Sequence, residues 1–180
     1  MSHLRPAVVL VSLFAVLLGL AMPLAMTGIG QVVFPAQANG SLVRVDGRVV
    51  GSELIAQPFT EPRYFQPRPS AVDYDGAASG ASNLAPTSAL LLAAVRERVT
   101  AYGTAPIPAD AAYASGSGLD PHISPENAAR QIPRVAAARG VPEARLAALV
   151  AAHTEGRVVG FLGEPRVNVL RLNLALDALR

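Results

Sequence analysis

The sequence predicts an α+β domain attached to one N-terminal membrane-spanning helix. Residues 7–26 contain no charged residue, and a helix of this length spans about 30 Å, the thickness of the hydrocarbon core of a bilayer. A strand–turn–strand pattern follows at 42–50, and several later segments carry the apolar period of helices. We therefore divide the chain into an N-terminus (1–6), a transmembrane helix (7–26) and a single domain (27–180).

The apolar stretch has two interpretations, a retained membrane helix and a cleaved signal peptide. A signal peptide needs a shorter apolar region that is closely followed by a small-residue cleavage site. The only good candidate for such a site, Ala36-Gln37-Ala38, lies well beyond residues 7–26. These features favour a helix that is retained in the membrane and contacts lipid.

Charges around the predicted helix indicate its orientation. His3 and Arg5 precede the helix, and the next charged residue along the chain is Arg44. Basic residues are enriched on the cytoplasmic side of membrane helices. We therefore expect residues 1–6 in the cytoplasm and residues 27–180 on the outer side of the membrane.

The first part of the domain combines a hairpin with a long loop. Residues 42–45 and 48–50 alternate in polarity around Asp46-Gly47, a pair that tolerates the positive φ angles of a tight turn. Residues 57–88 contain five prolines and several small polar residues. A loop of this length inside a compact domain is uncommon and is often functional.

Helices are predicted after this loop. Residues 91–102 have apolar side chains every three to four positions. Residues 124–126, Ser-Pro-Glu, supply the N-cap, the first-position proline and the acidic residue that begin a helix. Pro133 should end that helix after about two turns, and Pro142-Glu143 begins another.

The C-terminal part is less uniform. Residues 158–162 are predicted as a strand. Residues 167–179 show both the alternation of a strand and the period of a helix, and their length favours the helix.

Composition excludes several classes of protein. All 15 basic residues are arginine, and they are scattered among 13 acidic residues for a net charge of +2. A nucleic-acid partner is not expected, because such proteins normally carry a clustered basic face. The lack of lysine excludes a P-loop nucleotide hydrolase, and the lack of cysteine excludes disulfides and thiolate catalysis.

A serine, an aspartate and a histidine occur close together in residues 116–124, as they would in a hydrolase. A nucleophile elbow needs Gly-x-Ser-x-Gly after a strand, and Ser117 has neither that spacing nor a preceding apolar strand. Ser124 is explained as a helix N-cap, and Asp120-Pro121 as a turn. We therefore expect no catalytic residue. A metal site is not expected either, because the histidines are widely scattered, at His3, His122 and His153.

Two segments rich in glycine and small polar residues remain, 79–83 and 115–120. Such residues permit close backbone approach and many hydrogen bonds, which suits a docking surface. They are equally suited to holding loops together inside the domain. The candidate partner-contact residues are Ser79, Ser82, Asn83, Ser115, Ser117 and Asp120.

Small residues also recur along the predicted membrane helix. Ala15 and Gly19 are four positions apart, and so are Ala21 and Ala25. This spacing lets a neighbouring helix approach closely. The alternative is a helix that faces only lipid, in which these residues are incidental.

The ordered set of unusual segments resembles the C subunit of the Kdp-type potassium-transporting P-type ATPases of bacteria. The resemblance extends over nearly the whole chain. Its motifs are FPxQANGSL at 34–42, GSxLIxQxF at 51–59, YFxxRPSA at 64–71, SGxSNL at 79–84, ASGSGLD at 114–120, ISP at 123–125, QIPRVA at 131–136, VNV at 167–169 and LNLALD at 172–177.

The resemblance implies a single-pass subunit of a bacterial inner-membrane complex. The orientation expected from the charges places its domain in the periplasm. It implies three partners: a channel-like potassium-selecting subunit, a P-type ATPase subunit and a small single-helix subunit. Potassium and ATP are implied for the complex, and no cofactor is expected on this chain itself. The aspartyl-phosphate chemistry belongs to the ATPase subunit, and this chain has no Asp-Lys-Thr-Gly-Thr motif.

The family is also described as a catalytic chaperone that raises the affinity of the ATPase subunit for ATP. A domain outside the membrane cannot touch cytoplasmic ATP, so that effect would be an allosteric coupling between two sites. We therefore favour a non-catalytic role in assembly and ion access. The alternatives are a membrane-tethered serine hydrolase and a freestanding extracytoplasmic binding protein.

Overall fold

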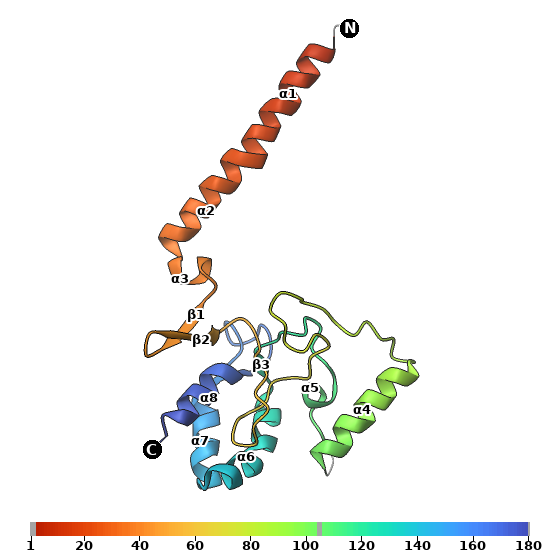
Figure 1. Ribbon diagram of the computed structural model, residues 1–180, viewed down its shortest axis with the longest axis vertical. Helices are drawn as coiled ribbons and strands as arrows, with labels where there is room; N and C mark the ends of the chain where they lie inside the picture. Colours follow the sequence, from red (N-terminus) through yellow and green to blue (C-terminus); the bar gives the residue numbers. More distant parts are fainter. Residues whose placement is uncertain (1–2, 104–105, 180) are drawn as a thin grey trace. The chain divides into compact units, whose positions relative to one another are not determined.

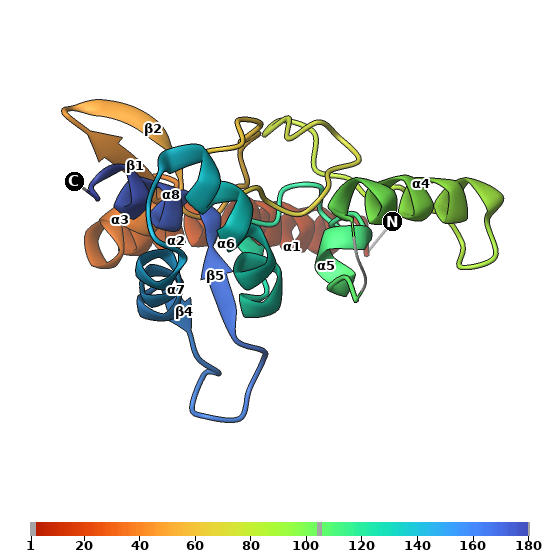
Figure 2. The same cartoon turned by 90° about the horizontal axis from the view of Figure 1, so that it is seen from below.

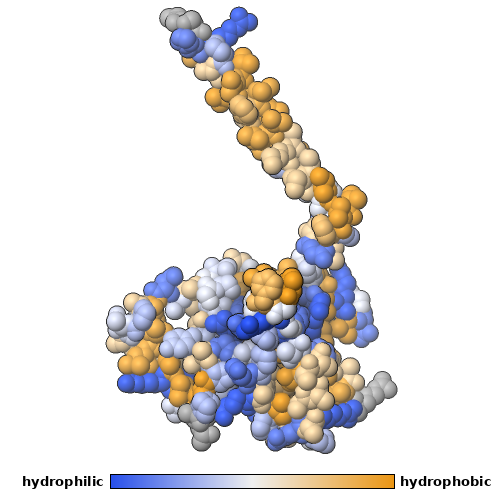
Figure 3. Space-filling model, turned by 180° about the vertical axis from the view of Figure 1, so that it is seen from behind, coloured by the Kyte–Doolittle hydropathy of each residue, from blue (hydrophilic) through white to orange (hydrophobic). Residues whose placement is uncertain are grey.

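A computed structural model describes residues 3–103 and 106–179. The chain forms two compact units, of which the first ends at Val49 and the second begins at Val50. The first unit contains a continuous apolar helix, Leu4–Val33, whose most apolar 18-residue stretch has a mean hydropathy of 2.6 and no buried residue. Figure 3 shows apolar side chains around this helix. By length and composition it is a candidate membrane span, which agrees with the predicted single-pass protein and extends the predicted helix at both ends.

The long helix changes its winding before Pro23. It consists of α1 (Leu4–Val16), a π-helical turn η1 (Leu17–Ala21) and α2 (Met22–Val33). Within η1 the Met22 N–H bonds to the Leu17 carbonyl, five residues back. Proline has no N–H, and its ring clashes with the carbonyl four residues earlier. A widened turn at this point relieves that clash, so the helix continues past Pro23.

The predicted hairpin is present after the helix. A short helix, α3 (Pro35–Ala38), precedes strands β1 (Leu42–Val45) and β2 (Arg48–Ser52), which pair with each other. Asp46 and Gly47 have φ angles of 49° and 79°, as the tight turn requires.

The second unit contains three helices and a small antiparallel sheet (Figures 1 and 2), which share one hydrophobic core. The helices are α6 (Pro125–Arg139), α7 (Glu143–Ala152) and α8 (Val169–Asp177). The strands are β3 (His122–Ile123), β4 (Thr154–Glu155) and β5 (Arg166–Asn168), in the order β3-β5-β4. The second unit is therefore an α+β domain, as predicted. Its most buried apolar side chains are Phe65, Ile123, Val135, Leu146, Val167, Leu172 and Leu176.

Two buried amide side chains hold the long loop against this core. Asn173 accepts a hydrogen bond from the Phe65 N–H and donates one to the Phe65 carbonyl, each at 2.9 Å. Gln131 does the same for Gln66, at 2.7 and 3.0 Å. Each amide thus satisfies the backbone donor and acceptor of a loop residue, and for the buried Phe65 these groups would otherwise be costly to bury. Phe65 is thereby placed in the core.

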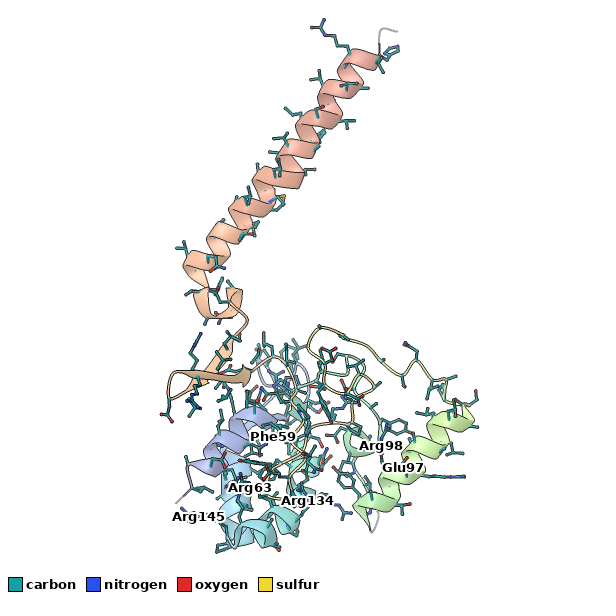
Figure 4. All side chains as sticks on the ribbon, in the orientation of Figure 1. Phe59, Arg63, Glu97, Arg98, Arg134 and Arg145 are labelled. Atoms are coloured by element: carbon teal, nitrogen blue, oxygen red, sulfur yellow. The ribbon has the colours of Figure 1, made fainter. Side chains whose placement is uncertain are left out.

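Helix α4 (Ala89–Tyr102) confirms another prediction, and Ser88 caps it by accepting a hydrogen bond from Leu91 N–H. Figures 1 and 2 both show α4 set apart from α6, α7 and α8. No residue of α4 is fully buried. Arg98, labelled in Figure 4, joins α4 to the short helix α5 (Ala109–Ala112) by donating to the Ala112 carbonyl at 2.9 Å.

Two expectations about the elements were wrong. Pro133 does not end its helix, because α6 continues to Arg139. Pro133 and Ala129, whose carbonyl it leaves without a donor, are both exposed, so that carbonyl can be hydrated. Residues 158–162 are not a strand but a turn closed by one bridge between Val158 and Leu162.

The ambiguous C-terminal stretch contains both structures. Residues Arg166–Asn168 form β5, and α8 begins at the next residue. The Asn168 side chain caps α8 by accepting a hydrogen bond from Arg171 N–H at 3.1 Å. The alternation and the helical period were both real, and they belong to consecutive elements.

Candidate functional site

The two polar loops predicted from sequence lie against each other. The Ser117 carbonyl accepts hydrogen bonds from the Gly80 N–H at 2.8 Å and from the Ser79 hydroxyl at 3.1 Å. The Ser70 hydroxyl donates to the Gly118 carbonyl at 2.7 Å. Residues 70, 79–80 and 115–118 therefore form one locked cluster, which we call the polar loop cluster.

Gly118 allows this close approach. Its φ angle is +70°, a conformation that favours glycine. A Cβ atom at this position would lie 2.5 Å from Val72 Cγ2 and 2.7 Å from the Gly80 carbonyl oxygen. Because both distances are shorter than normal contact, any other residue would force the loops apart.

The candidate contact residues differ in their accessibility. Ser79, Ser82, Asn83 and Ser117 are exposed on the domain surface. Ser115 is only 2% exposed, and its hydroxyl bonds to the Ser117 hydroxyl at 3.1 Å. Asn83 has a φ angle of 52°, which asparagine tolerates better than most residues. Four of the six residues can thus reach a partner directly, and Ser115 can act only by holding its loop.

Both serines of the hydrolase alternative are committed to local hydrogen bonds. Ser124 caps α6 by accepting a hydrogen bond from the Asn127 N–H at 3.0 Å. Its hydroxyl also donates a hydrogen bond to Asp110 Oδ1 at 2.9 Å. The Ser117 hydroxyl accepts from Leu119 N–H at 3.1 Å. These bonds are those of a helix cap and a turn, as the sequence indicated.

Asp120 belongs to an ion-pair cluster and not to a catalytic triad. Arg68 Nη1 lies 3.0 Å from Asp120 Oδ2, and the His122 N–H donates to Asp120 Oδ1 at 3.0 Å. The His122 ring nitrogen is 3.7 Å from the same carboxylate, beyond hydrogen-bonding distance. Burial alone would raise the pKa of Asp120, but His122 and Arg68 outweigh it, so the pKa is below its ordinary value. The cluster fixes the turn that leads into α6.

Asp110 has an organising role that sequence reasoning missed. Its Oδ2 accepts hydrogen bonds from the Ser124 N–H at 2.8 Å and from Asn127 Nδ2 at 3.0 Å. Its Oδ1 accepts a hydrogen bond from the Ser124 hydroxyl. The N-terminus of α6 is thus capped by a carboxylate from α5, which the helix dipole favours. No local pattern could identify this partner, because it lies 14 residues away.

Within residues 3–103 and 106–179, no group of three histidine, aspartate or glutamate side chains comes together as metal ligands would. The small residues of the membrane helix are all exposed: Ala15 lies in α1, Gly19 and Ala21 in η1, and Ala25 in α2. Helix–helix packing at these positions stays a prediction.

One apolar helix followed by an α+β domain defines the class of single-pass membrane proteins with one extramembrane domain. The family model described as "K+-transporting ATPase, c chain" matches residues 4–178, which include both the helix and the domain. The chain therefore belongs to the KdpC family of potassium-transporting ATPase C chains, and the resemblance seen in the sequence is confirmed.

Similar curated proteins cover essentially the whole chain. A protein of Sorangium cellulosum is 58% identical over 100% of both chains. A protein of Caulobacter vibrioides is 56% identical over 99% of this chain and 94% of its own. One of Methylococcus capsulatus is 53% identical over 99% of each. Each of the three is named a potassium-transporting ATPase KdpC subunit.

Proposed function

We propose that this chain is an accessory, non-catalytic subunit of a potassium-transporting ATPase complex and serves its assembly and ion access. The observation that carries the proposal is the family match, which runs from Leu4 through the whole domain to residue 178. The relatives have the same helix-plus-domain extent, since the alignments cover nearly all of both chains. Anchor and domain thus form one functional unit.

The chemistry of the complex then belongs to other subunits. The channel-like subunit selects potassium, the P-type ATPase subunit hydrolyses ATP, and a small single-helix subunit completes the assembly. In the described part of this chain, the serines and the carboxylate considered for catalysis are engaged in caps, turns and ion pairs. These contacts support a structural role for the residues and not a catalytic one.

The domain lies on the outer, periplasmic side of the membrane in this proposal. The orientation rests on Arg5, which precedes the apolar stretch 7–26, and on the lack of charge between that stretch and Arg44. An influence on ATP affinity would then be an allosteric coupling through the partner subunits.

The orientation is tested with a single cysteine at Ala77, an exposed position in a chain that has no other cysteine. We expect a membrane-impermeant maleimide to label Ala77→Cys in intact spheroplasts. Labelling only after lysis would place the domain in the cytoplasm and would make a direct effect on ATP binding possible.

The proposed contact with the channel-like subunit is the exposed face of the polar loop cluster together with the adjoining residues Ser82 and Asn83. Ser82 is exposed and its backbone does not have a positive φ, so Ser82→Arg changes the surface without straining the loop. We expect at least about tenfold weaker co-purification with the other subunits, equivalent to about 1.4 kcal/mol. Thr60→Arg, an exposed change elsewhere in the domain, is the matched control. Equal co-purification of both variants would exclude this face as the contact.

A further inference from the structure

The connection between β4 and β5 carries an exposed apolar tip. Residues 158–163 contain no polar side chain, and Figure 2 shows this connection projecting away from the helices of the domain. The exposed fractions are 52% for Val158, 81% for Val159, 75% for Phe161 and 61% for Leu162. Several large apolar side chains on one protruding turn are unusual for a surface that meets only water.

Part of the backbone of this apolar tip is paired within the turn. Val158 and Leu162 exchange two hydrogen bonds, Val158 N–H to Leu162 carbonyl at 2.9 Å and the reverse at 3.0 Å. The Gly160 N–H donates to the Arg157 carbonyl at 3.1 Å. Backbone groups that are already paired do not need water, and this condition limits which segments can enter an apolar medium.

Val159 is unfavourable for the isolated domain in two ways. Its φ angle is +55°, which is a genuine outlier for a β-branched residue. It is also the most exposed of the four apolar side chains. Asparagine, aspartate or glycine would suit this turn position better in water. Contacts within the domain therefore do not explain why an exposed valine occupies this position.

Two ion pairs form a collar at the base of the tip. Arg157 Nη2 lies 2.7 Å from Glu164 Oε2, and Arg166 Nε lies 3.0 Å from Glu155 Oε2. The collar has no net charge, and its side chains are solvent-accessible. An apolar end above a neutral, hydrated collar matches the change in polarity between the acyl chains and the headgroups of a bilayer.

Size favours lipid over a protein as the occupant. Four apolar side chains with these exposures offer on the order of 400 Å², whereas a stable protein–protein interface needs about 800 Å² from each partner. A bilayer is also within reach, because residues 34–49 would span at most about 55 Å if fully extended, and α3 and the β1–β2 hairpin shorten this connection further.

We propose that the apolar tip at 158–162 inserts into the lipid surface of the membrane in which the helix Leu4–Val33 is anchored. The tip is then a second, shallow attachment of the domain to the bilayer. The inference requires only that the helix spans a bilayer, and it does not depend on the proposed role in transport.

The test uses the full chain in vesicles of phosphatidylethanolamine and phosphatidylglycerol. Phe161→Cys and, as a matched exposed control, Thr60→Cys are each labelled with an environment-sensitive NBD maleimide. We expect spin-labelled lipid to quench the probe at 161 several-fold more than the probe at 60, and aqueous iodide to quench it less. Adding Val159→Asp should reduce lipid quenching at 161 to the control level, whereas Thr60→Asp should leave it unchanged. Aspartate tolerates the backbone conformation of Val159, so the turn is retained.

Equal quenching at the two positions would overturn the proposal. So would protection of the 161 probe that appears only after the other ATPase subunits are added, since that result would assign the tip to a protein pocket. Persistent lipid quenching in the Val159→Asp variant, with unchanged circular dichroism, would show that the apolar tip does not drive the contact.

Discussion

Replacing Gly118 by alanine tests whether the polar loops are held together by one close backbone approach. The added methyl group would lie 2.7 Å from the Gly80 carbonyl oxygen and 2.5 Å from Val72 Cγ2. The carbonyl is part of the backbone and cannot rotate away, and valine is a stiff side chain. The loops must therefore separate, which strains the hydrogen bonds that the Ser117 carbonyl accepts.

Two contributions determine how much Gly118→Ala destabilises the domain. A left-handed conformation costs a residue other than glycine about 1–2 kcal/mol. Inserting a methyl group into a packed site costs a further ~1–3 kcal/mol. Together they predict that the free energy of unfolding falls by about 2–5 kcal/mol. A typical domain has a free energy of unfolding of only about 5–15 kcal/mol, so this is a large share.

The assay is urea unfolding of the full chain in detergent, followed by circular dichroism. A loss of this size lowers the unfolding midpoint by about 1–3 M. Gly116→Ala is the matched control in the same loop, since no heavy atom lies within 4 Å of its added Cβ and its φ is not left-handed. That control should be neutral or stabilising by up to about 1 kcal/mol. Equal effects of the two substitutions would refute the close-approach argument.

Two further predictions concern the turn that leads into α6. Ser124→Ala should destabilise the domain by about 0.5–2 kcal/mol, because the α6 cap is lost, and should leave potassium uptake by the folded complex intact. If the folded Ser124→Ala variant lost potassium uptake and the unaltered chain showed esterase activity, the hydrolase hypothesis would be restored. The lowered pKa of Asp120 stabilises the fold above its ordinary value of about 3.9, and this contribution is lost as the pH falls through the folded pKa. The unfolding free energy of the Asp120→Asn variant should therefore fall less than that of the unaltered chain on acidification from about pH 5 to pH 2. An equal fall in both proteins would contradict the stabilising role of the Arg68–Asp120 ion pair.

Several elements followed from the sequence because their causes are local. The apolar run of the membrane helix, the Asp46-Gly47 turn and the cap at Ser124 each depend on residues a few positions apart. The period of residues 91–102 likewise predicted α4. Such features are set by helical pitch, strand alternation and capping geometry, which a short window of sequence contains.

The same locality explains the two errors. Pro133 was expected to stop α6, but α6 continues to Arg139, and the residue whose carbonyl this proline leaves without a donor is exposed. The run at 158–162 looks like a strand by composition, yet β5 takes its partners from β3 and β4. Exposure and strand partners are properties of the folded domain.

Sequence alone determined the class of this protein: a helix whose charge-free apolar stretch is long enough for a bilayer, joined to an α+β domain without lysine or cysteine chemistry. Tertiary structure decided which polar residues act together. Asn173 holds Phe65 across 108 positions, Asp110 caps a helix from another element, and Ser79 meets Ser117 across 38. These pairs have no fixed spacing in the sequence, because polar groups from separate loops and elements meet only when the folded chain brings them within hydrogen-bonding distance.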